Sequence, residues 1–419
     1  MAAWKQRRLD ELIRIKHGYA FSGQYFDSQG RYVVLTPGNF REEGGFKSKG
    51  EKEKRYCGKF PHEYLLNKGD LLVVLTEQGE GLLGSSAIVP ANELYLHNQR
   101  LGLVEIRDER ECDKRFLYYL FNTAPVRRQI RATATGTKIR HTSPTGIGAV
   151  TAAFPAVGEQ RRIAGILSAY DDLIENCRCR SRILEEVVRR LYQEWFVHFR
   201  YPGHESNRLP ATDTDQLPPG WKWVPLGGIT TKIGSGATPR GGKAAYKRAG
   251  IPLIRSMNVY DYRFEYSDLA FIDDEQARSL VGVSVQAGDV LLNITGTSVA
   301  RCALAPSHLL PARVNQHVAI IRANAELSNS SFLIDTLNSE LYKSRLLALA
   351  QGGATREALT KDTISGFPIL LPPPHLLDQY HRIAGPLHSK RESLRRQIQC
   401  LQSTRDLLLP RLSSGELSV

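Results

Sequence analysis

The two halves of the sequence repeat one pattern of landmarks, and this duplication limits the possible folds more than any other feature. With a shift of about 217 residues, the second half matches the first in the same order. A Trp, a Leu and a Gly open each copy, and an extended run then ends on Asn39 or Asn258. A Gly-Asp turn and an Asn-Gln pair follow in both copies, each before a strand-like run. We therefore predict a tandem repeat of one folding unit.

Each copy changes from a β-rich pattern to a helical one. Short runs of Val, Ile and Leu between Gly, Pro and Asn predict strands, and a long helical pattern follows them. The sequence thus predicts an α+β protein with two β-rich domains in tandem, joined by two long antiparallel coiled-coil helices. The predicted boundaries are 1–157 and 221–372 for the β-rich domains, 158–200 and 373–419 for the helical parts, and 201–220 for a Pro-rich linker.

The first helical pattern is the clearest element of the sequence. Its seam positions alternate spacings of four and three, as in a coiled coil, with Ser181 as the one polar interruption. The predicted seam residues are Ile163, Leu167, Tyr170, Ile174, Cys177, Leu184, Val188, Leu191 and Trp195. A helix of some 35 residues would be roughly 50 Å long, because each residue adds about 1.5 Å.

The second helical pattern is weaker. It has Lys390 on the seam and a slip of one residue after Leu394, and its predicted seam residues are Tyr380, Ile383, Leu387, Leu394, Ile398, Leu401 and Leu408. Because proline removes a backbone hydrogen bond, Gly385-Pro386 is expected to kink this helix or delay its start.

The charge of the chain favours a polyanionic partner. The formal net charge is +13, and most of it lies in the two β-rich segments, with +7 in residues 1–157 and +4 in residues 221–372. No apolar run approaches the roughly 20 residues that a membrane helix needs. The charged N-terminal residues do not resemble a signal peptide, so a cytoplasmic location is expected. Six cysteines without a C-x2-C pair suggest neither a zinc site nor a disulfide framework.

The sequence lacks the common catalytic motifs of enzymes that act on DNA. It has no glycine-rich cofactor loop after a strand and no Asn/Asp-Pro-Pro-aromatic segment, both of which an adenine methyltransferase would need. Neither an Asp/Glu-x-Lys triplet for metal-assisted cleavage nor an H-E-x-x-H motif is present. We therefore predict that this chain has no catalytic site and binds no metal or cofactor itself.

Basic residues interleaved with aromatics and glycines are the best candidates for DNA contacts. Residues 40–60 offer Arg41, Lys47, Lys49, Lys52, Lys54 and Arg55, and residues 238–256, taken as their counterpart, offer Arg240, Lys243, Lys247, Arg248 and Arg255. Lys138, Arg140 and Arg356 lie at matched places in the two copies. The Asn-Gln pairs at 98–99 and 315–316 occur in both copies, so we predict a structural role for them. If the two β-rich domains read different DNA sequences, the residues with which they contact bases should differ.

Taken together, these landmarks resemble the specificity (S) subunits of Type I restriction-modification systems. The resemblance covers essentially the whole chain, and the order of the duplicated landmarks makes it specific. Its carriers are Trp223, Leu226, Gly236, the Gly-Asp turns at 69–70 and 288–289, the Asn-Gln pairs, and the helix start at Glu159, Gln160, Ile163 and Ala164. The second helix start departs from this pattern, with Asp378 in place of Glu and one residue extra before Ile383.

This resemblance implies two target recognition domains, each reading one half of a bipartite site in double-stranded DNA, with the helices fixing the gap between the halves. It implies binding to two modification subunits, which methylate adenine with S-adenosylmethionine, and to restriction subunits that translocate and cleave DNA with ATP and Mg²⁺. Those cofactors are expected on the partner subunits.

Three other functions fit parts of the sequence. A stand-alone two-headed DNA-binding regulator would share the charge and the duplication, but would leave the outer faces of the helices without a partner. A fused methyltransferase or nuclease would need the missing motifs. A structural repeat protein would bind DNA weakly or without salt dependence.

Overall fold

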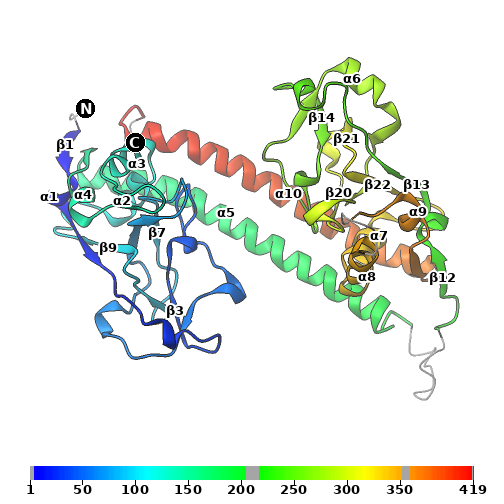
Figure 1. Ribbon diagram of the computed structural model, residues 1–419, viewed down its shortest axis with the longest axis horizontal. Coiled ribbons are helices and arrows are strands. Elements are labelled where there is room, and N and C mark those ends of the chain that lie inside the picture. The colour runs from blue at the N-terminus through cyan, green and yellow to red at the C-terminus, as the bar shows by residue number, and fades with distance from the viewer. Residues whose placement is uncertain (1–3, 204–216, 352–357, 418) are drawn as a thin grey trace. The chain divides into compact units, whose positions relative to one another are not determined.

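The computed structural model describes residues 4–203, 217–351, 358–417 and 419. They form two compact units: unit 1 combines Met1–Asn176 with Ile398–Val419, and unit 2 is Cys177–Gln397. The β-rich part of unit 1 is called head 1 here, and that of unit 2 is called head 2. The long helices α5 (Val157–Tyr192) and α10 (Pro374–Ser413) each contribute one part to unit 1 and one part to unit 2 (Figure 1).

Each head is built on a four-stranded antiparallel core sheet with the same strand order. In head 1 the order is β2 (Ile13–His17), β9 (Leu101–Ile106), β5 (Leu71–Val74) and β7 (Ser86–Ile88). In head 2 it is β13 (Thr230–Ser235), β22 (Val318–Ala323), β19 (Val290–Asn293) and β20 (Cys302–Leu304). The central strands β5 and β19 are fully buried, which is why their runs read as unbroken apolar segments.

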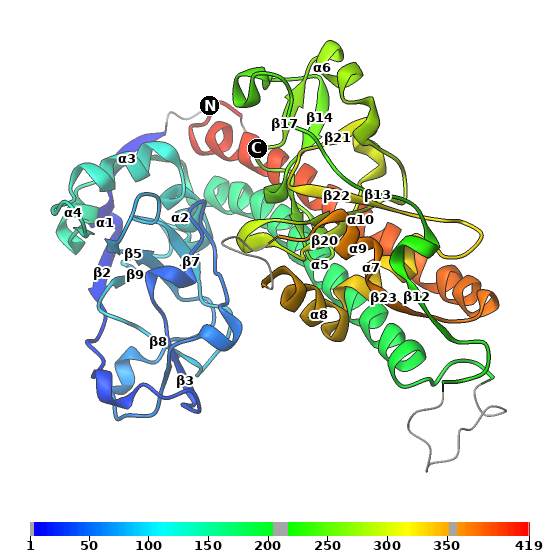
Figure 2. The same ribbon diagram turned by 45° about the vertical axis from the view of Figure 1, so that its right-hand side comes forward.

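Each head also has a second, smaller sheet, called the distal sheet here (Figure 2). In head 1 it lies away from the short helices, whereas in head 2 the short helix α6 (Asp274–Ser279) packs against it. In head 1 it is β4 (Arg55–Tyr56), β3 (Tyr32–Val34) and β8 (Tyr95–Leu96). In head 2 it is β17 (Ala270–Ile272), β14 (Ile251–Ile254), β21 (Ala312–Val314) and β18 (Ser284–Val285). Each contains one parallel pair, β3 with β8 and β14 with β21. The two heads therefore repeat the same topology.

The remaining elements repeat in part, because α6 of head 2 has no helical counterpart in head 1. Two-stranded ribbons pair the start of each head with its end: β1 (Lys5–Arg8) with β11 (Thr151–Phe154), and β12 (Lys222–Pro225) with β23 (Pro368–Leu371). The helices of head 1 are α1 (Leu9–Leu12), α2 (Lys114–Phe121), α3 (Ala124–Ala132) and α4 (Pro144–Gly148). Those of head 2 are α6 (Asp274–Ser279), α7 (Ser330–Asn338), α8 (Glu340–Gln351) and α9 (Lys361–Ser365). The fold confirms the predicted tandem of β-rich domains with two long helices.

The recurring landmarks are structural. A Cβ atom on Gly18 would come within 2.1 Å of the Asn98 carbonyl oxygen, and one on Gly236 within 2.1 Å of the Val314 carbonyl oxygen, so only glycine fits at either position. The Asn98 side chain accepts a hydrogen bond from the Arg100 backbone N–H, and Asn315 accepts one from His317. These turn contacts agree with the structural role predicted for the Asn-Gln pairs.

In each unit, a part of α5 packs against a part of α10 in antiparallel fashion. In unit 1, Ile163 and Leu167 share a core with Leu412, and the Arg405 guanidinium lies 2.6 Å from the Asp171 carboxylate. In unit 2, Arg391 pairs with Glu185, and the ring centroids of Tyr192 and Tyr380 are 6.4 Å apart. The start of α5 is therefore part of the core of head 1, and the start of α10 is part of the core of head 2.

The seam predicted for α10 was wrong at two positions, Ile383 and Lys390, whereas its other predicted residues face inward. Ile383 and Lys390 are exposed, whereas Ala384 and Arg391 are buried. The inward positions alternate spacings of three and four without a slip: Leu377, Tyr380, Ala384, Leu387, Arg391, Leu394, Ile398, Leu401, Arg405, Leu408 and Leu412. Two arginines interrupt the apolar pattern because each pairs with a carboxylate of α5. The seam of α5 itself is buried or half-buried at every predicted position.

The expected delay of the second helix at Gly385-Pro386 is also wrong. The helix begins at Pro374, in the first turn where proline leaves no hydrogen bond unmade, and it continues through Pro386. Packing of Tyr380 and Ala384 in the core of unit 2 offsets the backbone hydrogen bond that Pro386 removes. Among the described residues, no helix is both long and apolar enough to cross a membrane.

Candidate nucleic-acid interface

Three loops meet beside the core sheet of head 1, and we call them the three-loop edge of head 1: residues 40–46, 77–85 and 134–141. The first is a hairpin in which Phe40 bridges to Phe46 and the Arg41 N–H donates to the Gly45 carbonyl. The Ser85 hydroxyl donates to the Arg41 carbonyl at 2.6 Å. The third loop pairs with the second through β10 (Arg140–His141) and β6 (Thr76–Glu77).

Buried polar groups hold these loops in place. The buried Glu77 carboxylate accepts hydrogen bonds from the backbone N–H groups of Gly81, Leu82 and Leu83 at 3.2, 2.9 and 2.7 Å. Arg127 of α3 donates to the carbonyls of Glu42 and Gly81 and so ties the first loop to the second. Burial lowers the pKa of Arg127 to about 10, and it stays charged at neutral pH. The edge is therefore preformed.

Three predicted DNA-binding residues come together at this edge: Arg41, Lys138 and Arg140. Lys138 is exposed, whereas Arg140 is half-buried and lies 3.8 Å from the Glu80 carboxylate. The other predicted residues of head 1 lie near the distal sheet. Lys47, Lys52 and Lys54 are exposed there.

Two predicted DNA-binding residues of head 1 make hydrogen bonds within the protein. The Lys49 ammonium donates to the Thr36 hydroxyl at 2.9 Å, and burial lowers its pKa. The Arg55 guanidinium donates to the Gly30 carbonyl at 3.1 Å. These contacts favour a structural role for both.

Head 2 has the matching three-loop edge, made of residues 259–264, 295–301 and the chain at Ala358. The hairpin pairs β15 (Val259–Tyr260) with β16 (Arg263–Phe264), and Thr295 bridges to Ala358. Lys343 of α8 pairs with Asp261 in the hairpin, as Arg127 of α3 contacts the hairpin of head 1.

Sequence reasoning missed a cluster of charge on an aromatic ring at this edge. The guanidinium carbons of Arg263 and Arg301 lie 4.5 and 4.8 Å from the centroid of the Tyr260 ring. The two arginines come from loops almost 40 residues apart, so no local run of basic residues marks them. The sequence gives one signal for Arg263, which is its place in the repeat. Arg263 comes shortly after the run that ends at Asn258, and Arg41 comes shortly after the matching run that ends at Asn39.

The structure corrects the counterpart assigned to the basic segment 40–60. In topology, residues 40–46 match the hairpin 259–264, whereas residues 238–248 precede β14 and so match residues 19–31 before β3. Arg240, Lys243 and Arg248 are exposed on that segment, and Lys247 lies 3.6 Å from the Asp273 carboxylate. Arg255 is half-buried, stacks on Tyr246 at 5.3 Å and donates to the Asp268 carbonyl. Arg356 lies outside the described residues.

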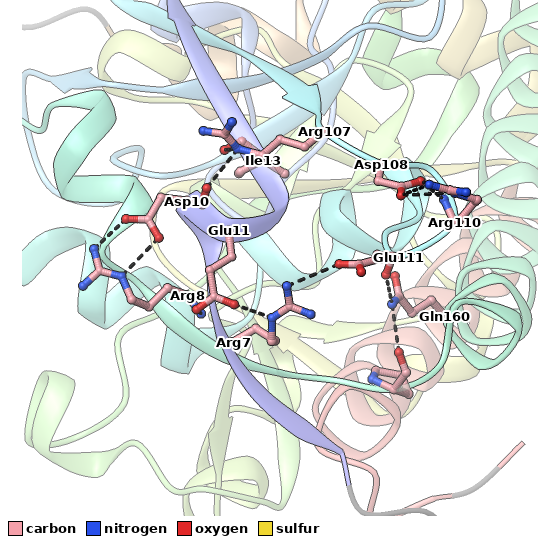
Figure 3. Close-up of polar contacts among 11 residues, drawn as sticks. Arg7, Arg8, Asp10, Glu11, Ile13, Arg107, Asp108, Arg110, Glu111 and Gln160 are labelled. Atoms are coloured by element: carbon pink, nitrogen blue, oxygen red, sulfur yellow. Dashed lines mark hydrogen bonds and ion pairs between the residues drawn. The ribbon is translucent and has the colours of Figure 1, made fainter.

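The Gln160 side chain anchors α5 to head 1. It is fully buried, accepts a hydrogen bond from the Asp113 N–H, and donates to the Glu111 and Pro155 carbonyls, all at 2.9 Å. Figure 3 shows this contact beside the ion pairs of Arg7 with Glu11 and Glu111. In the same view, hydrogen bonds from Arg110 lower the pKa of Asp108 to about 2. The Glu-Gln helix start is therefore a structural feature.

The outer faces of the long helices carry exposed apolar side chains. In unit 1 these are Leu173 of α5 and Leu407 of α10, which is 70% exposed. In unit 2 they are Ile183, which is 56% exposed, and Val187 of α5, with Ile383 of α10. Exposed apolar residues in such numbers on helices suit a protein partner. No group of three or more potential metal ligands occurs within the described ranges.

Comparisons with known proteins agree with this architecture. Residues 1–185 match the family described as the Type I restriction modification DNA specificity domain. The chain is 29% identical over 307 residues to the Type I restriction enzyme MjaIX specificity subunit of Methanocaldococcus jannaschii, covering 73% of this chain and 69% of that protein. It is 22% identical over 421 residues to the Type I restriction enzyme EcoBI specificity subunit of Escherichia coli, covering 94% and 81%.

A solved structure shares the fold. The crystal structure of the Type-I restriction-modification system S subunit from M. genitalium matches with a TM-score of 0.66 and 18% identity, over 98% of this chain and 96% of that chain. The likeness therefore extends over both heads and both long helices.

Proposed function

Because this chain belongs to the family of Type I restriction-modification specificity subunits, we propose that each head reads one half of a bipartite DNA target. The resemblance seen in the sequence is confirmed by the comparisons. The long helices would set the gap between the half-sites. At about 1.5 Å per residue, the 36 residues of α5 make a helix about 54 Å long, which exceeds one turn of B-DNA at about 34 Å.

One observation carries this proposal: two heads with the same core-sheet topology present three-loop edges of different chemistry. A shared scaffold places the loops, and the differing side chains on them give each head its own base preference. Arg41, Lys138 and Arg140 are the candidates in head 1, and Tyr260, Arg263 and Arg301 are those in head 2. The exposed lysines near the distal sheet of head 1 would contact phosphates, which adds affinity but no sequence preference.

The partners follow from the same premise. We propose that two modification subunits dock on the exposed apolar faces of α5 and α10, and that restriction subunits join this complex in the cytoplasm. S-adenosylmethionine, ATP and Mg²⁺ would act on those partners, and this chain would contribute no catalytic group. The exposed Ile183, Val187 and Ile383 in unit 2 support a protein partner on the helices.

The experiment is to co-express the chain with the modification subunits of its own system in a host without DNA methylation. N6-methyladenine is then mapped by single-molecule sequencing. A bipartite, asymmetric motif that requires this chain is the expected result. Methylation that is unchanged without the chain would contradict the proposal and favour the stand-alone DNA-binding regulator.

The docking surface has its own test. Replacing Ile183 and Val187 with Ser should weaken co-purification with the modification subunits, while the paired exposed change Arg182→Gln and Arg189→Gln, on another face of the same helix, serves as the control. Equal co-purification of both variants would place the partner elsewhere.

A further inference from the structure

We propose that Arg263 and Arg301, stacked on Tyr260, read guanine in the half-site of head 2. This inference rests on the proposed function and assigns the specificity of one head to named side chains. The two arginines come from separate loops of the three-loop edge of head 2, and the Tyr260 ring holds both.

The geometry prepares both guanidinium groups for a ligand. Stacking on a ring fixes the plane of a guanidinium group and leaves its N–H donors pointing away from the ring edge. Within the described ranges, neither Arg263 nor Arg301 makes a side-chain hydrogen bond or an ion pair. A charged fork that is ordered before binding loses less conformational entropy when it binds.

Two carboxylates lie near the pair, and both already have partners. Glu265 lies close enough to Arg263 for an electrostatic interaction and accepts hydrogen bonds from the Ser267 hydroxyl at 2.7 Å and the Ser267 N–H at 3.3 Å. Asp261 lies at the tip of the same hairpin, where it pairs with Lys343 and accepts a hydrogen bond from the Cys302 N–H at 3.4 Å.

Arg263 is exposed and Arg301 is half-buried, so the pair can reach a partner outside the protein. Burial lowers the pKa of Arg395 of α10 to about 10, and the positive charge of Arg263 makes a smaller contribution in the same direction. Arg395 therefore adds positive charge near Arg263. The surroundings therefore favour an electronegative ligand.

Guanine is the base whose chemistry matches this pair. On its major-groove edge it presents two acceptors, N7 and O6, to which an arginine fork donates two parallel hydrogen bonds. Adenine offers one acceptor and one donor there, and cytosine offers a donor. A guanidinium pair thus discriminates for guanine.

Comparison of the heads favours base reading over phosphate binding. The positions of Tyr260 and Arg301 correspond to Arg41 and Ser85 in head 1, so the chemistry of the edge changes between the heads. By contrast, the helix residue that holds the hairpin is basic in both heads, as Arg127 and Lys343. Contacts that only position DNA can stay alike, whereas contacts that read two different half-sites must differ.

The test uses the complex with its modification subunits and a duplex that carries the motif mapped for the wild-type complex. Each guanine is replaced in turn by 7-deazaguanine, which lacks the N7 acceptor. The wild-type complex should lose about 10-fold in affinity at one or more guanines of one half-site. Arg263→Gln and Arg301→Gln should each weaken binding to the unmodified duplex by about 10- to 100-fold. Each variant should also become insensitive to 7-deazaguanine at one of those positions.

The controls separate this inference from the proposed function. Arg278→Gln, at an exposed arginine of α6 away from the edge, should keep the wild-type pattern. Circular dichroism and co-purification with the modification subunits confirm that each variant is folded. If the variants weaken binding to every duplex equally and remain sensitive to each 7-deazaguanine, the arginines contact phosphates and the inference is wrong. If the wild-type complex methylates no bipartite motif, the proposed function fails instead.

Discussion

Head 1 and head 2 share one topology but distribute charge around their distal sheets in opposite ways. In head 1 the segment before the sheet, residues 19–31, is rich in aromatic side chains, and the segment 47–59 is strongly basic. In head 2 the segment before the sheet, residues 237–250, is basic, and residues 265–275 contain five acidic residues and no basic one. The same scaffold therefore offers different surfaces to a polyanion.

The difference has a structural basis in head 1. Tyr56 is 1% exposed and makes edge contacts with Phe21, Tyr25 and Phe26 at ring-centroid distances of 5.0, 6.1 and 5.3 Å. This aromatic cluster forms a small core for the distal sheet, so the basic segment that follows is free to stay in solvent. Packing preserves the scaffold, and the exposed loops are free to differ.

The largest expected change in the free energy of unfolding comes from giving each long helix the residue that the other helix has at the matching seam position. Leu167 and Ala384 occupy equivalent seam positions and are both buried. Leu167→Ala should lower the free energy of unfolding by about 2–5 kcal/mol through the cavity it leaves. Ala384→Leu should lower it by about 1–3 kcal/mol through overpacking. Urea unfolding followed by circular dichroism measures both changes.

The exposed Leu173 of the same helix provides the control for this exchange. Leu173→Ala should change the free energy of unfolding by no more than about 0.5 kcal/mol in the isolated chain. A loss as large as that of Leu167→Ala would show that the seam has been assigned to the wrong face.

The sequence revealed the duplication and the seam of α5 because both depend on apolar residues at regular spacings. On α10 it misplaced the seam at Ile383 and Lys390, because the inward positions beside them are Ala384 and Arg391 and not large apolar side chains. The match of Ile163 with Ile383 was also misleading, because the equivalent position is Tyr380. Charged pairs across a seam leave no local apolar signal.

The candidate site was less accessible from sequence for a similar reason. The density of basic residues in the sequence selected Lys49 and Arg55 as DNA-binding candidates, but both side chains make hydrogen bonds within the protein. The same criterion did not select Arg263 and Arg301, because these two residues are far apart in the sequence and meet at the Tyr260 ring only in the folded protein. Which basic residues remain free depends on tertiary contacts that the order of residues does not encode locally.

Acid should destabilise head 1 more than head 2. Burial lowers the pKa of His97 in head 1 from 6.5 to about 4, and the equivalent residue in head 2 is Val314. Between these two pKa values the unfolded chain binds the proton and the folded one does not, so stability is lost as the pH falls from about 6.5 to about 4. The full loss would be about 3 kcal/mol.

Amide hydrogen exchange across this pH range would sharpen the comparison, after correction for the intrinsic exchange rates. Protection of β9 in head 1 should fall more steeply than protection of β22 in head 2. His97→Val should remove the difference, and a difference that survives this change would assign the acid sensitivity to another group.

The smallest expected effect concerns the basic segment of head 1. Replacing the exposed Lys47 and Lys52 with Gln should lower DNA affinity for all sequences and reduce the slope of log K against log salt by about 2. Lys49→Gln is the matched control, since its ammonium is bonded to Thr36 and should affect stability more than the salt slope. An unchanged slope for the double variant would place the phosphate contacts of head 1 elsewhere.

The most direct test of the two-headed account is to change the hairpin of one head and map the methylated motif again. Residues 41–45 would be replaced by a Gly-Ser segment of equal length in the complex with the modification subunits, with N6-methyladenine mapped by single-molecule sequencing. The account predicts that one half of the motif relaxes or changes, while the other half and the gap stay as in the wild type. A change in both halves, or in the gap alone, would contradict the assignment of one half-site to each head.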